Sequence, residues 1–406
     1  MFKFLHIADV HFDAPLSSKD SHIRRDLKIS QKDAFTKAVD FCIKEEIDGL
    51  LIAGDLFDNE RISLSSEKFL WESFEKLRKE KIHVFYAPGN HDPAIYLKTK
   101  FGENVHIFDR DIPTEYVIKD NKDSECRIIG VGHLNDNEKR NLIRKFPRKA
   151  DERPVVAVAH TMVENVEADE TKGKYMPTSL GDMLEKKYDY WALGHIHQWI
   201  QFKDYPIYYS GTIQGLNINE TGLKGGNLIK LAGKSIEVEF IPFNSLFFEQ
   251  TTIDISGEYE SDYDFYNILK GLIADELKSF SYSPKNMIVR VYITGQTNMV
   301  KYLSSMENVG YLEEELAQDL DVKSIEIKKN QLKNIVKLET LIQDNMVLED
   351  IMALIENPGS DKKLLRNLKS LKFQEFENDQ DVEMLISENK EELVELIMTY
   401  FTGDKS

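Results

Sequence analysis

The chain has 406 residues, a formal net charge of −18 and a hydrophobic content of 41%, so it can form two or three globular domains. The acidic excess argues against a broad basic surface for nucleic acid, although metal ions could neutralise a local carboxylate cluster beside a phosphate. The sequence contains no apolar run near the ~20 residues of a membrane span, no signal segment and only two cysteines, Cys42 and Cys126. We therefore expect a cytoplasmic protein with reduced thiols in its core.

Residues 1–245 alternate short apolar runs with amphipathic stretches, which predicts an α/β fold of layered mixed β-sheets flanked by helices. Ser30–Asp33 could cap one helix, and residues 64–80 form a second amphipathic helix. Beyond His197 the predicted strands are divided by glycine turns, so we expect antiparallel strands to close a sheet whose first half is parallel. Five apolar runs have the character of buried strands: Phe2–Ala8, Leu50–Ala53, Ile82–Gly89, Pro154–Ala159 and Asp189–Gly194.

Polar side chains follow each of these five runs where the predicted strand ends. Ligands in layered α/β folds bind beyond strand ends, so the pattern predicts one shared metal site built around Asp55. The residues so placed are Asp9 and His11; Asp55 and Asp58; Asn90, His91 and Asp92; His160; and His195 and His197.

These residue types suit the hydrolysis of phosphoesters with two metal ions. Such an enzyme holds two cations roughly 3.5–4 Å apart, so that they share a water and the phosphate oxygens. Asp55 can offer an oxygen to each cation, and His195 and His197 could bind one cation each. With Asn90 and further imidazoles, this set of oxygen and nitrogen donors suits Mn²⁺, Fe²⁺ or Zn²⁺ better than Ca²⁺ or Mg²⁺. His91 could be the protonated group beside the phosphate.

The remainder of the chain is predicted to form two further parts. Residues 246–330 repeat the strand and helix pattern on a smaller scale, which indicates an α+β accessory domain that shapes access to the site. Residues 331–406 are predicted to form a helical, partner-binding tail. Its end, 371–406, has ten acidic and three basic residues, so it is not expected to bind DNA. An apolar stripe in this end either packs on its own chain or binds another protein: Val382, Leu385, Ile386, Leu393, Leu396, Ile397, Tyr400 and Phe401.

One basic stretch stands out against the acidic background. Residues 139–149 contain no acid, and the stretch is either a solvated helix and loop or a contact for a phosphate backbone. Its cations are Lys139, Arg140, Arg144, Lys145, Arg148 and Lys149.

Taken together, the five motifs resemble those of the calcineurin-like metallophosphoesterases. More narrowly, the chain is similar to the SbcD/YhaO-like DNA repair exonucleases, through residues 5–11, 53–58, 209–215 and 219–225. The resemblance is strong over residues 1–240 and weak over 246–330, and no match covers the tail.

The resemblance implies a role for each site residue. One cation would take Asp9, His11, Asp55 and His197, and the other would take Asp55, Asn90, His160 and His195. His91 would stabilise the transition state or protonate the leaving oxygen, with Asp92 positioning it. The implied activity is Mn²⁺-dependent cleavage of DNA phosphodiesters. The implied partners are DNA, an ATPase of the SbcC or YhaN type gripped by C-terminal helices, and a second copy of the chain.

The sequence departs from the family pattern at one position. Some of these nucleases carry a histidine where this chain has Asp58, and we expect Asp58 to hydrogen-bond to a ligand instead.

Two alternative functions stay open. The first is a phosphatase or nucleotide phosphodiesterase. It is disfavoured because the residues that follow Asp58, and the Asp92 that ends the next motif, differ from those usual in the protein phosphatases of this superfamily. The second is a catalytically silent DNA-end-binding scaffold, which the complete ligand set disfavours.

Overall fold

The computed structural model describes residues 1–15, 21–58, 62–93, 101–120, 123–164, 175–335, 346–360 and 379–402. The chain divides into two compact units, one of residues 1–252, 270–292 and 310–328 and one of residues 253–269, 293–309 and 329–406. These units do not coincide with the segments 1–245, 246–330 and 331–406, so the division into three domains stays a prediction. Within the described ranges, no helix has the length and apolar character needed to cross a membrane.

The first of two large sheets has a parallel centre. Its six strands lie in the order β12-β11-β1-β2-β3-β4. Strands β1, β2, β3 and β4 run parallel to one another, whereas β11 is antiparallel to β1 and β12 is antiparallel to β11. This arrangement confirms the predicted parallel half closed by antiparallel strands. The strands are β1 (Phe2–Ile7), β2 (Gly49–Ile52), β3 (His83–Tyr86), β4 (Val105–Ile107), β11 (Gly225–Ala232) and β12 (Ser235–Pro242).

The second sheet repeats the parallel centre. Its order is β5-β6-β7-β8-β10-β9, in which β6, β7, β8 and β10 are parallel and the edge strands β5 and β9 are antiparallel to their neighbours. The strands are β5 (Thr114–Lys119), β6 (Glu125–Val131), β7 (Val155–His160), β8 (Tyr190–Gly194), β9 (Ile200–Gln201) and β10 (Ile207–Tyr209).

The two sheets share one buried apolar layer. Successive side chains of a strand point to opposite faces, so Phe4 and Leu51 of the first sheet meet Val156 of the second, while Leu5 and Leu50 face outwards. Because both faces of the central strands are covered, these side chains are fully buried, and each stabilises the fold by about 1.5–3 kcal/mol.

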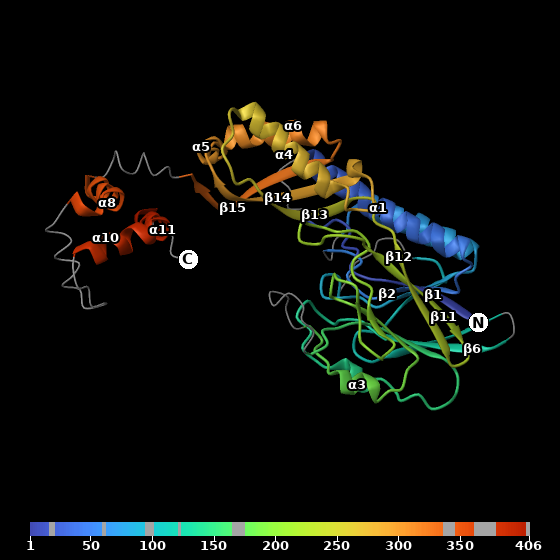
Figure 1. Ribbon diagram of the computed structural model, residues 1–406. Coiled ribbons are helices and arrows are strands. Elements are labelled where there is room, and N and C mark those ends of the chain that lie inside the picture. Colours follow the sequence, from blue (N-terminus) through green and yellow to red (C-terminus); the bar gives the residue numbers. More distant parts are fainter. Residues whose placement is uncertain are drawn as a thin grey trace. The chain divides into compact units, whose positions relative to one another are not determined.

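Helices cover the outer faces of both sheets, as predicted. Helices α1 (Ser21–Lys44) and α2 (Leu64–Lys79) pack on the first sheet, and Figure 1 shows the length of α1 along it. The short helix α3 (Leu180–Leu184) and the 3-10 turn η1 (Leu142–Lys145) pack on the second sheet.

The start of α1 differs from the prediction. The helix begins at Ser21, and Ser30 lies inside it, where its buried hydroxyl donates to the carbonyl of Leu27 at 2.9 Å. The Ser30–Asp33 pattern is therefore not a cap, because Ile23 and Leu27 extend the apolar stripe by two turns and pack on a further apolar cluster. Helix α2 has the expected start, with the Ser63 side chain accepting from the Ser66 N–H.

A third, smaller sheet has the strand order β13-β14-β15, and helices alternate with its strands in the chain. This α+β pattern was predicted for residues 246–330, although β15 continues beyond them. The elements are β13 (Phe247–Asp254), α4 (Asp262–Leu277), the 3-10 turn η2 (Pro284–Asn286), β14 (Met287–Thr297), α5 (Val300–Ser304), α6 (Met306–Asp319) and β15 (Ser324–Asn334).

The tail contains the helices α8 (Met346–Glu356), α10 (Asp379–Glu388) and α11 (Lys390–Thr402), with the 3-10 turn η3 (Pro358–Ser360). The three helices bury a small apolar cluster of their own: Leu348, Met352, Ile355 and Ile386, with Ile351, Leu393, Val394 and Ile397 against it. Part of the predicted stripe therefore packs within the chain. Leu385 and Leu396 keep 38% and 67% of their surface exposed, and the side chains of Val382, Tyr400 and Phe401 lie outside the described residues.

Candidate metal centre

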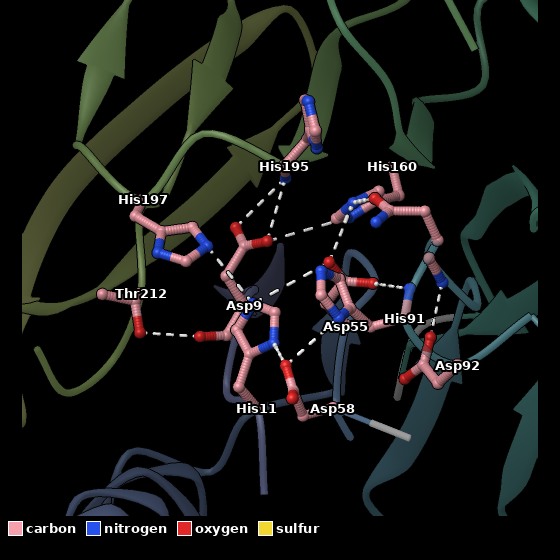
Figure 2. Close-up of polar contacts among 12 residues, drawn as sticks. Asp9, His11, Asp55, Asp58, His91, Asp92, His160, His195, His197 and Thr212 are labelled. Carbon is pink, nitrogen blue, oxygen red and sulfur yellow. Dashed lines mark hydrogen bonds and ion pairs between the residues drawn. The ribbon is translucent and has the colours of Figure 1, made fainter. Parts of the chain in front are cut away.

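The predicted site residues meet at the carboxyl ends of the parallel strands. Asp9 follows β1, Asp55 follows β2 and Asn90 follows β3, while His160 ends β7 and His195 follows β8. Figure 2 shows Asp9, Asp55, His160 and His195 close together, beyond the ends of the strands that carry them. Of the strand-end residues, Asp55, Asn90 and His195 line a cavity of about 460 Å³, and Asp9 and His160 are fully buried behind it. Its polar walls are His11, Asp55, Asp58, Asn90, His91, Tyr175, His195, His197, Asn217 and Glu220.

The backbone at these strand ends is strained. The φ angle is 50° at Asp9, 52° at His11, 46° at Asp55 and 105° at His195, and such left-handed conformations cost a non-glycine residue about 1–3 kcal/mol each. Backbone hydrogen bonds hold them, since the Asp9 N–H donates to Gly54 O at 3.2 Å and the His11 N–H donates to Asp55 O at 2.9 Å. The side chains of His11, Asp55 and His195 thereby line the cavity, and the buried Asp9 lies beside them.

At two positions of the predicted motifs, Gly54 and Gly89, a neighbouring side chain lies too close for any residue but glycine. A Cβ atom on Gly89 would lie 2.1 Å from Oδ1 of Asp55. Gly54 has a φ of +90°, and a Cβ atom there would lie 2.2 Å from Nδ1 of His160. Because no side chain fits at either position, glycine lets the loops approach Asp55 and His160.

Asp9, His11 and His197 form a first group of potential metal ligands. The Nε2 atoms of His11 and His197 lie 3.2 Å apart. Each ring has its Nδ1 beside a carboxylate: His11 Nδ1 is 3.0 Å from Asp58 Oδ1 and His197 Nδ1 is 2.8 Å from Glu220 Oε1. Since Nδ1 must donate to the carboxylate, the Nε2 lone pairs face each other, an arrangement that a bound cation satisfies.

Asp9 also belongs to a second group, with Asp55 and His160. Nδ1 of His160 lies 3.0 Å from the carbonyl of Ala53, to which it can donate, so Nε2 carries the lone pair. That Nε2 lies 3.0 Å from Asn90 Oδ1 and 3.3 Å from Asp55 Oδ2. Asp55 Oδ2 is also 3.8 Å from His11 Nε2 of the first group. Asp55 therefore lies between the two groups, where a bridging ligand is needed.

The charges of the second group depend on one another. Burial opposes ionisation of Asp55, but His160, His11 and His91 hold the pKa of its carboxyl well below the usual range. Burial alone would lower the pKa of His160, whereas Asp55 and Asp9 raise it to about 9. A concentrated negative charge from buried carboxylates thus favours a cation at this position, and the mixture of oxygen and nitrogen donors fits a divalent transition metal.

His195 contributes first through its backbone. Its N–H donates to both carboxylate oxygens of Asp9 at 3.1 Å, as Figure 2 shows. Its ring centroid lies 5.2 Å from that of His160. Within the described ranges, the groups of potential ligands do not include the His195 imidazole, so its role as a ligand stays a prediction.

The contact predicted between Asp92 and His91 is made by Asp58 instead. Oδ1 of Asp58 lies 3.1 Å from Nδ1 of His91, and this hydrogen bond raises the pKa of His91 to about 9 against the lowering effect of burial. Asp58 thus lies between His11 and His91 (Figure 2), and these three residues form a third group of potential ligands, so the expected role of Asp58 as a hydrogen-bonding partner of a ligand stays a prediction. Asp92 holds the loop, since its oxygens accept from the N–H groups of Gly89 and Phe57 and from the Tyr86 hydroxyl.

Two residues beside the site were not predicted from the sequence. Glu220 contacts His197 as described above, and the Thr212 hydroxyl donates to the Asp9 carbonyl at 2.6 Å (Figure 2). Both lie in the two segments 209–215 and 219–225 that support the family resemblance, and this is the signal that could have identified them.

The basic stretch 139–149 is paired with acids from other segments. Arg144 lies 3.0 Å from Asp182, and Lys149 lies 2.7 Å from Asp189. Arg140 contacts Glu138 and Asp111, and Lys139 lies over the ring of Tyr175. These pairs favour a structural role for the stretch over contact with a phosphate backbone.

The fold and this site agree with the family comparison. Residues 2–199 match the model of the calcineurin-like phosphoesterase family. The chain therefore contains a calcineurin-like metallophosphoesterase domain, which confirms the predicted resemblance and fold class.

Among individual proteins, the chain is 30% identical over 260 residues to the metallophosphoesterase YhaO of Bacillus subtilis (strain 168), with 62% of this chain and 63% of YhaO covered. It is 28% identical over 248 residues to the DNA double-strand break repair protein Mre11 of Archaeoglobus fulgidus, with 54% and 51% covered. For Mre11 of Methanocaldococcus jannaschii the identity is 25% over 262 residues, with 59% and 65% covered. The chain thus spans about half to two thirds of the length of these relatives.

Proposed function

We propose that the protein is a phosphodiesterase that uses two divalent metal ions, Mn²⁺ among the candidates, to cleave DNA as an exonuclease. One observation carries the proposal: two groups of lone-pair donors lie side by side, with Asp55 Oδ2 at 3.8 Å from His11 Nε2 and at 3.3 Å from His160 Nε2. A phosphate oxygen shared by two cations fits such a pair of neighbouring sites.

In this proposal the ligands divide between two cations. Asp9, His11, Asp55 and His197 would hold one, and Asp55, Asn90, His160 and His195 would hold the other. When bound, the metal pair supplies an activated water and neutralises the charge that develops on the phosphate. The protein keeps the imidazole lone pairs directed at the metals through Asp58, Glu220 and the Ala53 carbonyl.

His91 would act on the substrate rather than on the metals. Its side chain is 43% exposed at the cavity wall, and its Nδ1 is held by Asp58 at 3.1 Å. With Nδ1 donating to Asp58, the opposite Nε2–H can reach a phosphate oxygen or protonate the leaving oxygen. Asp58 also orients His11, so one carboxylate would align a ligand and a proton donor.

DNA is proposed as the substrate on the strength of the relatives named for DNA double-strand break repair. The proposed partners are an ATPase of the SbcC or YhaN type and a second copy of the chain. We place the activity in the cytoplasm, where the buried thiols of Cys42 and Cys126 would stay reduced.

The experiment is a comparison of substrates in Mn²⁺ and in EDTA. Linear double-stranded DNA, single-stranded DNA, bis-p-nitrophenyl phosphate and p-nitrophenyl phosphate are offered to the wild-type protein and to a His11→Ala control. Mn²⁺-dependent release of nucleotides from DNA ends, absent in the control, supports the proposal. Hydrolysis of the monoester alone would favour a phosphatase. Binding of DNA ends with no hydrolysis of any substrate would favour a scaffold.

A further inference from the structure

Three hydrogen bonds from residues that the structure describes hold the carboxylate of Glu220 beside the metal centre. Its Oε1 accepts from His197 Nδ1 at 2.8 Å and from Asn217 Nδ2 at 3.0 Å, and its Oε2 accepts from the Leu216 N–H at 2.7 Å. The Glu220 N–H in turn donates to the Asn217 carbonyl at 3.0 Å. The side chain is only 14% exposed, so both oxygens are occupied and the carboxylate has one defined orientation.

The loop that carries Glu220 is anchored on the side away from His197. Gln250 Nε2 donates to the Ile218 carbonyl at 2.8 Å. The Ile218 side chain packs against an apolar cluster of Leu27, Leu246, Phe248 and Ile288. Because the loop is fixed at both its backbone and an apolar side chain, it can hold Glu220 rigidly against His197.

The contact with Glu220 determines which ring nitrogen of His197 is available to a metal. With Nδ1 donating to Glu220, the Nε2 lone pair is directed to Nε2 of His11, 3.2 Å away, and into the first ligand group. Without Glu220 the ring could rotate or adopt the opposite tautomer, in which Nε2–H would face the cation.

We propose that Glu220 is a positioning residue that fixes the tautomer and orientation of His197 and thereby sets the metal affinity of the Asp9, His11 and His197 group. This inference rests on the proposed two-metal function. Glu220 touches neither the metals nor the substrate in this account, and it acts through His197 alone.

The isosteric variant Glu220→Gln tests the proposal. An amide has one acceptor and one donor end, so it cannot accept from both His197 and Leu216. Mn²⁺ binding is measured by titration calorimetry on the full chain after treatment with EDTA, and by electron paramagnetic resonance. We expect about a 10–100-fold loss of affinity for one of two Mn²⁺ ions, with the other unchanged. The spectrum of a coupled pair should give way to that of single ions at limiting Mn²⁺.

Two further variants separate positioning from general damage to the loop. Asn219→Ala, in the same loop but outside the cavity lining, removes only a 3.4 Å contact with Gln250 and keeps the carboxylate of Glu220 beside His197, so both Mn²⁺ affinities should stay near the wild-type values. In a His197→Ala background, Glu220→Gln should weaken Mn²⁺ binding no further, because its only route of action is already removed.

Three results would overturn the assignment. These are wild-type affinity for both Mn²⁺ ions in Glu220→Gln, an equal loss of affinity in Asn219→Ala, or an additional loss of affinity when Glu220→Gln is added to His197→Ala. A wild-type protein that binds no Mn²⁺ would instead contradict the proposed function itself, so the two failures can be told apart.

Discussion

His11 and His197 approach each other from different sheets, with their Nε2 atoms 3.2 Å apart. His11 follows β1 of the first sheet and His197 follows β8 of the second. Their meeting requires the two sheets to be packed, so the metal centre exists only in the folded protein. Metal binding and folding stability must therefore be linked.

Added Mn²⁺ is expected to stabilise the protein against unfolding, because the unfolded chain cannot assemble both ligand groups. At a free Mn²⁺ concentration one hundred times the dissociation constant, one site contributes about 2.7 kcal/mol. Urea unfolding in EDTA and in Mn²⁺ measures the difference. The His11→Ala variant, which loses a ligand, should gain much less stability from Mn²⁺. An equal gain in stability in that variant would show that Mn²⁺ binds elsewhere.

His91 should affect turnover and not metal content. His91→Ala removes the group that Asp58 holds beside the cavity, and turnover is expected to fall by ~10²–10⁴-fold. Metal analysis after desalting should find the wild-type amount of bound Mn²⁺. If the variant loses its metal, His91 acts as a ligand and its assignment as a proton donor is wrong.

His6 should make the fold sensitive to acid. Its ring is fully buried, with Tyr190 Oη at 3.0 Å and the Leu193 carbonyl at 3.1 Å, and burial lowers its pKa from 6.5 to about 3. The unfolded chain therefore binds more protons between these pH values, so stability falls as the pH drops below 6.5.

The measurement is a comparison of the wild type with His6→Gln in urea at pH 7.5 and pH 5, with EDTA present. The free energy of unfolding of the wild type, relative to that of His6→Gln, should be about 2 kcal/mol smaller at the lower pH, because only the wild type must keep His6 uncharged. A difference in unfolding free energy that does not change with pH would mean that His6 is protonated in the folded state at pH 5.

The tail should bind its partner through the apolar side chains that remain exposed. Leu385→Glu with Leu396→Glu leaves the cluster around Ile386 and Leu348 intact, so the melting temperature should not change. Binding of an SbcC- or YhaN-type ATPase in a pull-down should be lost. Met306→Glu, at another exposed apolar side chain, is the matched control and should bind normally. Full binding by the tail variant would contradict this docking surface.

The strand-end residues were predictable because each signal is local. An apolar run followed by Asp55 or by His160 identifies both the strand and its end, and parallel strands bring such ends together. We also expected Asp58 to hydrogen-bond to a ligand, but we did not expect Asp58, instead of Asp92, to contact His91. That contact depends on how two loops pack. The contact between Glu220 and His197, which are 23 residues apart in the sequence, depends on loop packing in the same way. The start of α1 was missed because Ser30 resembles a cap when its packing is unknown.

The two-metal account is tested most directly at Asp55. Asp55→Asn keeps an oxygen that can accept from the His91 N–H, a bond of 2.9 Å in the wild type, so the fold should survive. Asp189→Asn, which removes a carboxylate bound by Lys149 at the far end of β8, is the control. We expect Asp55→Asn to lose Mn²⁺-dependent DNA hydrolysis and to bind fewer than two Mn²⁺ ions, while Asp189→Asn keeps both properties. Near-normal turnover with full Mn²⁺ binding in Asp55→Asn would contradict a bridging carboxylate and with it the two-metal site.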